Sequence, residues 1–360
     1  MPTSIDEIKQ GREHGDQLLH LREKRKELER EVEKLKADIG EQKELQSAIV
    51  GAIQAADPFT RVPCKAGTKT ESGVVAVFEW GDWHTGENTK PSQIEHVNAY
   101  GWNIQQKRIN LITDDFLNWI ETQRHGYRID RVNVFGMADW ISGDIHYELT
   151  ATNEFPVPVQ AVNAGLLLGE QLLKIAAHFE EVVFNGIGID NHGRNTKKYQ
   201  FKDGYENSWN FVVYEVAKAF IANAKNIQFV MPSGMKELVT VADHNYLIEH
   251  GHLIKGWAGY PYYGSGRVKG REAVRRMKFM RDEWRKEVDK MKREYGFDYY
   301  SHAHFHVSCM PDYDTICNGA LTGTNELDHA CGRYAPPAQN AWLTHRKHGM
   351  FNFCAFRGRK

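Results

Sequence analysis

The chain has 360 residues, of which 41% are hydrophobic and 26% are charged, and its formal net charge is −1. This balance is ordinary for a globular protein and excludes a strong global attraction to nucleic acid or membranes, so any such attraction must be local. No run of about 18 apolar residues occurs, so we expect no membrane-spanning helix and no membrane partner. Five cysteines without CxxC spacing, and no signal-peptide pattern, favour a cytoplasmic location.

The first predicted element is a helix within residues 1–57, which we treat as a separate N-terminal segment. Apolar side chains recur three and four residues apart from Leu18 to Ile39, with charges of both signs between them. This spacing is typical of a coiled coil of about three heptads, which would join two copies in a homodimer or bind another partner. A lone amphipathic helix stays open, as does a DNA-binding role for the basic cluster at residues 22–26. Asp57-Pro58 ends the helix, because the residue before proline resists the α conformation.

Residues 58–360 are predicted to form one domain in which strands alternate with helices. Such alternation argues for a layered α/β fold. The predicted strands are 74–80, 131–136, 181–189, 227–231, 236–241, 246–249 and 298–301. The predicted helices are 94–123, 157–178, 208–224 and 268–295, and a Gly- and Tyr-rich loop at 259–270 leads into the last of them.

Polar side chains follow the first two of these strands directly. Asp82 and His84 come after strand 74–80, two residues apart, so in extended chain both side chains point the same way and can bind one ion. Asp139 follows strand 131–136 by three residues. Each run is a weak signal by itself, because a turn explains it equally well.

Two further runs strengthen the pattern. Asn191 and His192 follow strand 181–189, and His250-Gly251-His252 comes later in the chain. Histidines then occupy alternate positions 302, 304 and 306 after strand 298–301, which is hard to explain as core packing. Hard oxygen ligands and neutral imidazoles delivered from several strand ends to one point suit a pair of divalent metal ions.

In this order the runs resemble the calcineurin-like metallophosphoesterases. Their pattern is Asp-x-His, Gly-Asp-x-x-x-x-Gly, Gly-Asn-His-Asp/Glu, a lone His, and Gly-His-x-His. The resemblance covers roughly residues 74–325 and implies a layered α/β/β/α sandwich. Asn-Gly-Ala-Leu-Thr-Gly at 318–323 is similar to a run in phage-encoded members, and DNA repair exonucleases belong to the same superfamily.

The resemblance implies a catalytic centre with two divalent ions, Mn, Fe or Zn. One ion would be held by Asp82, His84, Asp139 and His306, and the other by Asp139, Asn191, His250 and His304, with Asp139 as the bridge. Such ions activate a water for in-line attack at phosphorus. His192 would protonate the leaving alkoxide. His252 would contact the metal-binding residues without binding an ion itself.

The sequence departs from the family pattern at several positions. The Gly-Asp doublet is interrupted before Asp139, and Gly143-Asp144 offers Asp144 as an alternative bridge. Asp190 stands in place of the glycine before Asn191, and Ala303 in place of the glycine in the last motif. Gly193 replaces the acid that normally steadies the catalytic histidine, so another group must steady His192 or the activity is low.

The predicted substrate contacts are basic. Arg194 follows the catalytic loop and is suited to bind phosphate, and Arg267 and Arg275 lie in a strip, 267–293, with twelve Lys/Arg against five Asp/Glu. A solvated helix face explains the strip equally well. We therefore expect a phosphodiesterase or nuclease that cleaves nucleic acid. The alternatives are a small-molecule phosphatase or cyclic-nucleotide phosphodiesterase, and a non-catalytic metal-binding scaffold.

Overall fold

The computed structural model describes Lys24, Lys26, Arg30 and residues 73–199, 201–232, 234–256, 261–283 and 296–358. The chain divides into two compact units, Met1–Ala55 and Ala56–Lys360, and the architecture below is that of the second. Lys24, Lys26 and Arg30 are helical and exposed. The predicted coiled-coil stripe and the predicted boundary at residue 57 lie outside the described residues.

The first sheet has six strands in the order β11-β10-β1-β2-β3-β4. β1 to β4 run parallel, and β10 and β11 add an antiparallel edge beside β1. Parallel strands are covered on both faces, which is why β1 reads as a continuous apolar run. The strands are β1 Val74–Trp80, β2 Arg131–Gly136, β3 Glu181–Gly186, β4 Ile227–Val230, β10 Ala338–His345 and β11 Gly349–Arg357.

The second sheet has five strands in the order β5-β6-β7-β9-β8. β6, β7 and β9 are parallel, and β5 and β8 pair antiparallel at the two edges. The carboxyl ends of β6 and β7 therefore lie at one end of this sheet. The strands are β5 Lys236–Val241, β6 His244–Glu249, β7 Tyr299–His302, β8 Cys309–Asp312 and β9 Thr315–Cys317.

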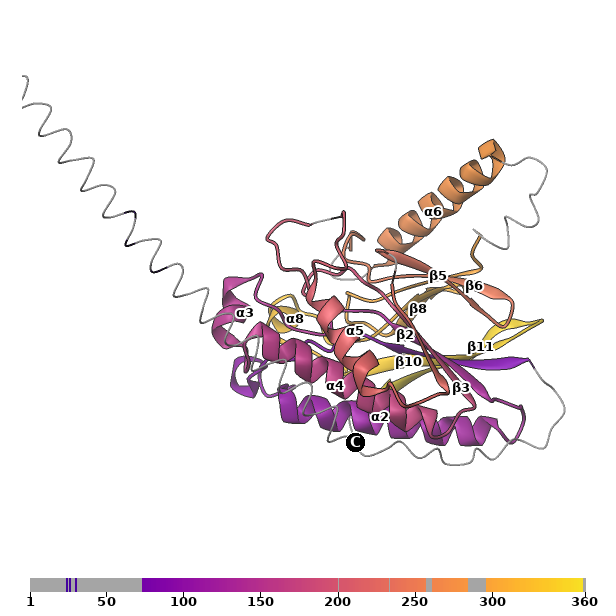
Figure 1. Cartoon of the computed structure of the whole chain (residues 1–360), viewed down its shortest axis with the longest axis horizontal. Coiled ribbons are helices and arrows are strands. Elements are labelled where there is room, and N and C mark those ends of the chain that lie inside the picture. Colours follow the sequence, from indigo (N-terminus) through magenta and orange to yellow (C-terminus); the bar gives the residue numbers. More distant parts are fainter. Residues whose placement is uncertain are drawn as a thin grey trace, which may run out of the picture. The chain divides into compact units, whose positions relative to one another are not determined.

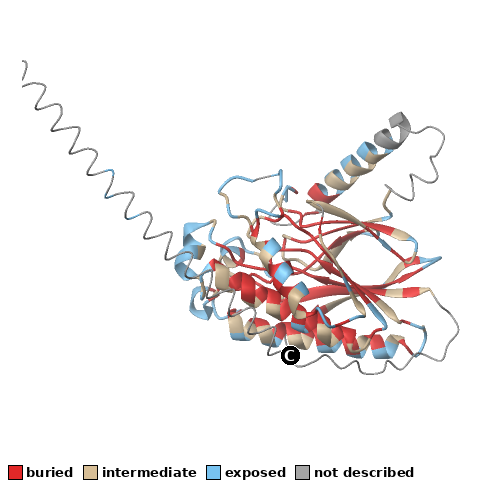
Figure 2. Ribbon diagram, in the orientation of Figure 1, coloured by how far each residue is buried: buried red, intermediate tan, exposed pale blue. Residues whose placement is uncertain are grey.

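The two sheets pack face to face, with helices on the outer face of each (Figure 1). α2, α4 and α5 share one apolar core with the first sheet, and α6 packs on the second sheet through Val268. A third core, which includes Val77, Phe135 and Trp342, fills the space between the sheets. Burial is accordingly highest along the strands and on the inner helix faces (Figure 2). The longer helices are α2 Trp102–Gln123, α4 Val157–Ala176, α5 Trp209–Phe220 and α6 Tyr262–Glu283.

The structure confirms the predicted mixed α/β architecture, with two corrections and some elements that were missed. The predicted helix 94–123 begins only at Trp102, because Pro91–Gln93 forms a separate 3-10 turn, η1, and Glu95 and His96 adopt positive φ. α6 begins at Tyr262, so most of the predicted Gly- and Tyr-rich loop is helical. Within the described residues no helix is both long and apolar enough to cross a bilayer. The elements that were not predicted are β8, β9, β10, β11, α3 Tyr147–Thr152 and α8 Glu326–Ala330.

A buried carboxyl group ties the sheets together near the end of β1. Glu79 accepts hydrogen bonds from the Ser301 hydroxyl on β7 and from Nδ2 of Asn340 on β10, the latter at 3.3 Å. Burial raises the pKa of Glu79 to about 8, although both hydrogen bonds lower it. The contact fixes the ends of β1 and β7, from which two of the predicted metal-binding runs leave.

Candidate metal centre

The loops that follow β1, β2, β3, β6 and β7 bring the predicted metal-binding residues to one place. Parallel strands present their carboxyl ends at one edge of a sheet, and here two stacked sheets do so together. Three sets of side chains place candidate ligand atoms within 4.8 Å of one another. The sets are Asp82, His84 and His306; His84, Asp139 and His192; and Asp139, His250 and His304.

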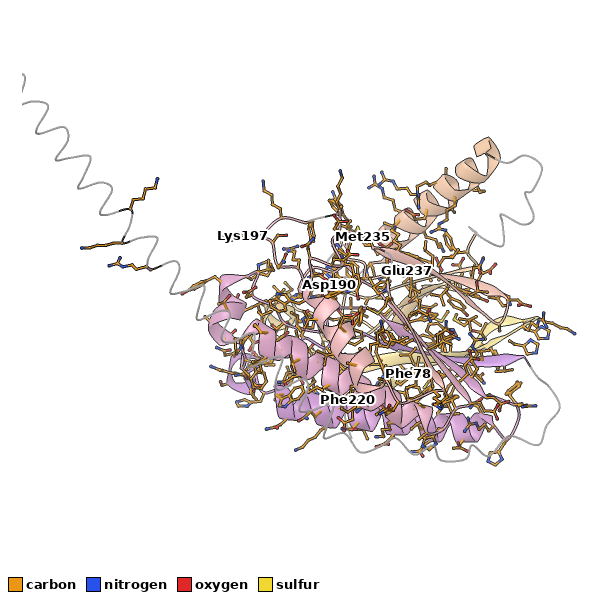
Figure 3. The ribbon with its side chains drawn as sticks, viewed as in Figure 1. Phe78, Asp190, Lys197, Phe220, Met235 and Glu237 are labelled. Atoms are coloured by element: carbon orange, nitrogen blue, oxygen red, sulfur yellow. The ribbon has the colours of Figure 1, made fainter. Side chains whose placement is uncertain are left out.

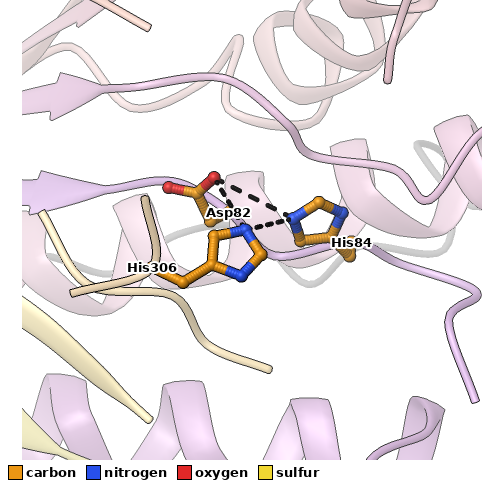
Figure 4. Close-up of side chains that lie close together, drawn as sticks. All are labelled: Asp82, His84 and His306. Atoms are coloured by element: carbon orange, nitrogen blue, oxygen red, sulfur yellow. Dashed lines mark hydrogen bonds and ion pairs between the residues drawn. The ribbon is translucent and has the colours of Figure 1, made fainter. Parts of the chain in front are cut away.

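The first set joins the β1 loop to the β7 loop. Nε2 of His84 lies 3.2 Å from Nε2 of His306 and 3.9 Å from Oδ1 of Asp82. Nε2 of His306 lies 3.5 Å from the same carboxylate oxygen, and the three side chains face one another in Figure 4. Ligand atoms that each lie about 2.0–2.2 Å from one ion are roughly 3–4 Å apart, so these spacings suit a shared cation.

The third set, Asp139, His250 and His304, joins the loops after β2, β6 and β7, and Asn191 from the β3 loop lies beside it. Nε2 of His250 lies 3.1 Å from Oδ2 of Asp139 and 3.0 Å from Oδ1 of Asn191. The His304 ring centroid lies 5.3 Å from that of His250. Oδ2 of Asp139 is also 3.9 Å from Nε2 of His84, so one carboxylate oxygen faces both sets. This is the position that a bridging ligand needs.

The two aspartates present one oxygen each to the centre. Oδ2 of Asp82 accepts the backbone N–H of His304 at 3.3 Å, and Oδ1 of Asp139 accepts that of His192 at 3.2 Å. Oδ1 of Asp82 and Oδ2 of Asp139 are buried and face histidine nitrogens, at 3.5 Å from Nε2 of His306 and 3.1 Å from Nε2 of His250. Burying two carboxylates this close together is costly, and a bound cation would offset that cost. The donor set therefore fits divalent metal ions.

Backbone carbonyls orient two of the histidines. Nδ1 of His250 is 2.8 Å from the Met137 carbonyl oxygen, and Nδ1 of His192 is 2.7 Å from that of Ser142. A carbonyl oxygen can only accept, so Nδ1 carries the proton in both rings. Nε2 is then the nitrogen that faces the centre. Metal-binding histidines are held in this way, with the outer nitrogen donating to an oxygen.

Carboxylates face the outer nitrogens of two other histidines. Nδ1 of His84 lies 3.8 Å from Oε2 of Glu87, and Nδ1 of His306 lies 3.8 Å from Oδ2 of Asp328. Oε1 of Glu87 accepts a hydrogen bond from Nδ2 of Asn325 at 3.0 Å. Both acids are buried, and neither was predicted from the sequence, because they contact the centre only through the rings that they face.

The site loops use strained backbone. Non-glycine residues rarely adopt positive φ, and where they do so at a site, the surrounding structure enforces it. The φ of Asp139 is 50°, and the preceding Ala138 has a φ of 67°. Such conformations turn side chains from an extended strand end toward one point. The other predicted ligands with positive φ are Asp82, His84, His304 and His306.

The electrostatics of the cluster favour a positive charge at its centre. Burial raises the pKa of Asp139, but the neighbouring histidines, His250 first, hold it well below its usual range. Burial lowers the pKa of His250, yet the Asp139 carboxylate outweighs burial and raises it to about 10. Asp139 is thus held in its charged form, and a divalent ion would supply the positive charge that protonated imidazoles otherwise provide.

His192 has a defined orientation despite the missing acid. The Ser142 carbonyl that accepts its Nδ1 proton precedes Gly143, whose φ is 71°. A Cβ atom at Gly143 would lie 2.3 Å from the His192 carbonyl oxygen, so only glycine permits this approach. The ring centroid of His192 is 4.5 Å from that of His84. The group that steadies the histidine is therefore a backbone carbonyl from the β2 loop.

Asp190 is a structural contact that the sequence analysis did not assign. Its Oδ2 accepts the backbone N–H of Asp139 at 2.7 Å and Nδ2 of Asn210 at 2.8 Å, and its Oδ1 accepts the N–H of Gly193 at 2.6 Å. It therefore holds the β2 and β3 loops together. Burial raises its pKa to about 6, with Asp139 adding to the shift. The one sequence feature that pointed to Asp190 was its position before Asn191, where the family pattern has glycine.

The remaining predicted site residues lie at different distances from the cluster. Asp144, the alternative bridge, is exposed and belongs to none of the three sets. The His252 ring centroid lies 5.7 Å from that of His250. His302 is buried and contacts the Ser265 hydroxyl on α6 at 2.7 Å, so it has a packing role behind the centre.

The predicted substrate-binding arginines are in two separate places. Arg194 follows the β3 loop, with its Cζ 4.2 Å from the ring centroid of Tyr199. Arg267 and Arg275 are exposed on α6, and Arg275 is paired with Glu272 at 2.7 Å.

No protein-family profile matches the chain, and no curated protein sequence matches it. Among solved structures, it is similar to Zn²⁺-complexed Vps29 from Entamoeba histolytica, with 9% identity over 79% of this chain and 99% of the other, at a TM-score of 0.26. It is similar to the sulfate thiohydrolase SoxB from Thermus thermophilus, with 9% identity over 81% and 58%, at 0.33. It is also similar to purple acid phosphatase PPD1 from yellow lupin, with 12% identity over 80% and 54%, at 0.31. Likeness this remote carries no argument, so the inference below rests on the geometry of the site.

Proposed function

We propose that this chain is a metal-dependent phosphoester hydrolase of the calcineurin-like metallophosphoesterase type, with a centre for two divalent ions. The observation that carries the proposal is the position of Asp139 Oδ2, a buried oxygen that lies 3.1 Å from Nε2 of His250 and 3.9 Å from Nε2 of His84 and so faces both ligand sets. The proposed ligands of one ion are Asp82, His84, Asp139 and His306, and those of the other are Asp139, Asn191, His250 and His304.

The mechanism assigns separate tasks to the chain's own groups. When bound, two divalent ions lower the pKa of water and offset negative charge on phosphoryl oxygens. The aspartates and histidines fix the place where this happens. His192, held through Nδ1–H by the Ser142 carbonyl, would act as an imidazolium, giving its second proton from Nε2 to the leaving oxygen of the ester and returning to the neutral ring. Asp190 keeps the loops that carry Asp139 and His192 in register.

We further propose that the substrate is a phosphodiester, in nucleic acid. An acid that delivers a proton is needed most when the leaving group is a strongly basic alkoxide, as in a polynucleotide. A comparison of substrates distinguishes this proposal from a small-molecule phosphatase or a cyclic-nucleotide phosphodiesterase.

Metal loading tests the proposed function directly. The purified protein is expected to bind about two equivalents of Mn, Fe or Zn and to hydrolyse bis-p-nitrophenyl phosphate, and chelation should abolish both properties. The assay compares this diester with p-nitrophenyl phosphate, single-stranded DNA, duplex DNA and RNA. A protein that binds no metal, or that binds metal and cleaves none of these, contradicts the proposal. Faster cleavage of the monoester than of every diester would favour a phosphatase.

We also propose that the N-terminal segment makes the protein a homodimer, on the basis of the heptad-like spacing from Leu18 to Ile39. A chain that lacks residues 1–56 is then expected to be monomeric while it still hydrolyses bis-p-nitrophenyl phosphate, because no predicted ligand lies in the deleted part. Light scattering of both chains gives their masses. Equal numbers of subunits in the two would contradict the coiled coil.

A further inference from the structure

A loop beside the candidate metal centre has the chemistry of a nucleic-acid contact. It begins two residues after His192 and is closed by an antiparallel bridge between Arg194 and Ser208. The backbone N–H of Trp209, the first residue of α5, donates to the Gly193 carbonyl at 2.7 Å. The loop is therefore held at its base by the same segment that positions the proposed catalytic acid.

The first part of this loop, residues 194–202, is basic and aromatic. It contains four Lys or Arg residues and no Asp or Glu. Lys197 and Lys198 are exposed, and Figure 3 shows Lys197 at the solvent side of the fold, far from Phe78 in the core. Tyr199 is 40% exposed and Phe201 is 61% exposed. Exposed aromatic rings beside lysines offer a surface on which unpaired bases can stack.

An ordered stack connects the loop to the centre. The Arg194 guanidinium lies over the Tyr199 ring, and the Tyr199 and His252 rings are stacked with centroids 5.0 Å apart. The His252 ring is in turn 5.7 Å from that of His250, a proposed metal ligand. Nε and Nη1 of Arg194 are buried and receive no partner. The stack fixes the loop against the catalytic edge.

The basic strip on α6 is less suited to this role. In its described part, Lys269 is held by Asp312 and Asp314 at 2.7 and 2.6 Å. Arg275 pairs with Glu272 at 2.7 Å. Cations that already have carboxylate partners gain little from a phosphate, because the existing pair must be broken first. Residues 194–202, in contrast, contain no Asp or Glu, and the nearest acids in the sequence of this loop are Asp203 and Glu206 in its second part.

We propose that residues 194–202 bind a single-stranded segment of a polynucleotide next to the scissile phosphate. The lysines contact backbone phosphates, and Phe201 stacks on an unpaired base, which a duplex does not offer. The inference rests on the proposed function and deepens it, since it names single strands as the preferred substrate.

Charge reversal tests the contribution of the lysines. Lys197→Glu with Lys198→Glu should lower kcat/KM for a single-stranded oligonucleotide by about tenfold or more, and should reduce the slope of log affinity against log salt by about 1.4, since each lost phosphate contact removes about 0.7. Hydrolysis of methyl p-nitrophenyl phosphate, which has no base and no second phosphate, should stay unchanged. The matched control reverses two exposed lysines elsewhere, Lys107 on α2 and Lys225 before β4. A loss equal to that of the control, or an equal loss on both substrates, overturns the proposal.

The aromatic contact has its own test. Phe201→Leu keeps an apolar side chain but removes the ring, and should weaken single-strand cleavage by about 5- to 100-fold while duplex cleavage changes little, as expected from a loss of about 1–3 kcal/mol of stacking. Phe201→Tyr retains a ring and should restore single-strand cleavage. An unchanged Phe201→Leu variant, or one that is not restored by tyrosine, contradicts base stacking.

Binding separates failure of this inference from failure of the proposed function. Fluorescence anisotropy with a labelled thymidine 20-mer in EDTA measures the affinity of the protein for single-stranded DNA without hydrolysis. If the wild-type chain fails to cleave any ester yet binds the 20-mer, and Lys197→Glu with Lys198→Glu abolishes binding, the loop inference holds and the hydrolase proposal is wrong. If cleavage occurs but these substitutions leave the affinity for the 20-mer unchanged, the loop inference is wrong and the hydrolase proposal stands.

Discussion

Replacing Asp139 with Asn is expected to lower phosphoester hydrolysis by about 10³-fold or more and to remove at least one metal equivalent. The charge lost is the one that both ligand sets share, and two bound ions supply several kcal/mol of transition-state stabilisation. Asn is the suitable replacement because the φ of Asp139 is 50°, a conformation that Asn tolerates better than most residues. The backbone N–H bond to Asp190 does not depend on the side chain and remains.

Asp144→Asn is the matched control for this prediction. Asp144 was the alternative bridge in the sequence, and the structure places it in an exposed position. Its substitution should leave metal content and hydrolysis unchanged. Metal content is measured by elemental analysis and hydrolysis with methyl p-nitrophenyl phosphate, and circular dichroism checks that both variants fold. Full metal content in Asp139→Asn, or a loss confined to Asp144→Asn, would overturn the assignment of the bridge.

The first strands of the centre were predictable because a strand that is buried on both faces appears in the sequence as a continuous apolar run. β1 and β2 run over the residues that the apolar runs indicated, whereas the predicted strand 181–189 ends at Gly186 as β3. Each polar run directly after such a strand could then be placed at a sheet edge without knowledge of the sheet order. The antiparallel pair β10 and β11 was missed, because Gln339 and Asn340 interrupt its apolar pattern. Their side chains are buried and paired inside the fold, which only the tertiary structure reveals.

The groups that orient the ligands were not predictable. Glu87 and Asp328 are far from each other in sequence, and carbonyls such as that of Ser142 carry no side-chain signal. The start of the helix α6 was not predictable from its local sequence either. Gly264 and Gly266 disfavour a helix by about 1 kcal/mol each, yet Gly264 packs so closely on the Lys255 carbonyl that a Cβ would lie 2.1 Å from it. Tertiary packing thus overrides local propensity.

His192→Asn is expected to reduce hydrolysis by about 10²–10⁴-fold on an oligonucleotide while metal content stays intact. Within the described residues His192 shares a set with His84 and Asp139, so its distance alone does not separate an acid from a ligand. Its Nδ1 contact with Ser142 fixes the ring but does not depend on a metal. Loss of metal from the variant would assign His192 to the ligands instead.

The leaving group gives the sharper test of His192. A general acid matters only when the departing oxygen needs a proton, so the effect should depend on how basic that oxygen is. His192→Asn should therefore impair cleavage of an oligonucleotide, whose leaving alkoxide is strongly basic, much more than cleavage of methyl p-nitrophenyl phosphate, whose leaving phenolate is weakly basic. A disturbed centre would impair both substrates equally. Comparison of kcat on the two substrates, for the wild type and the variant, thus distinguishes proton transfer by His192 from a role in holding the site together.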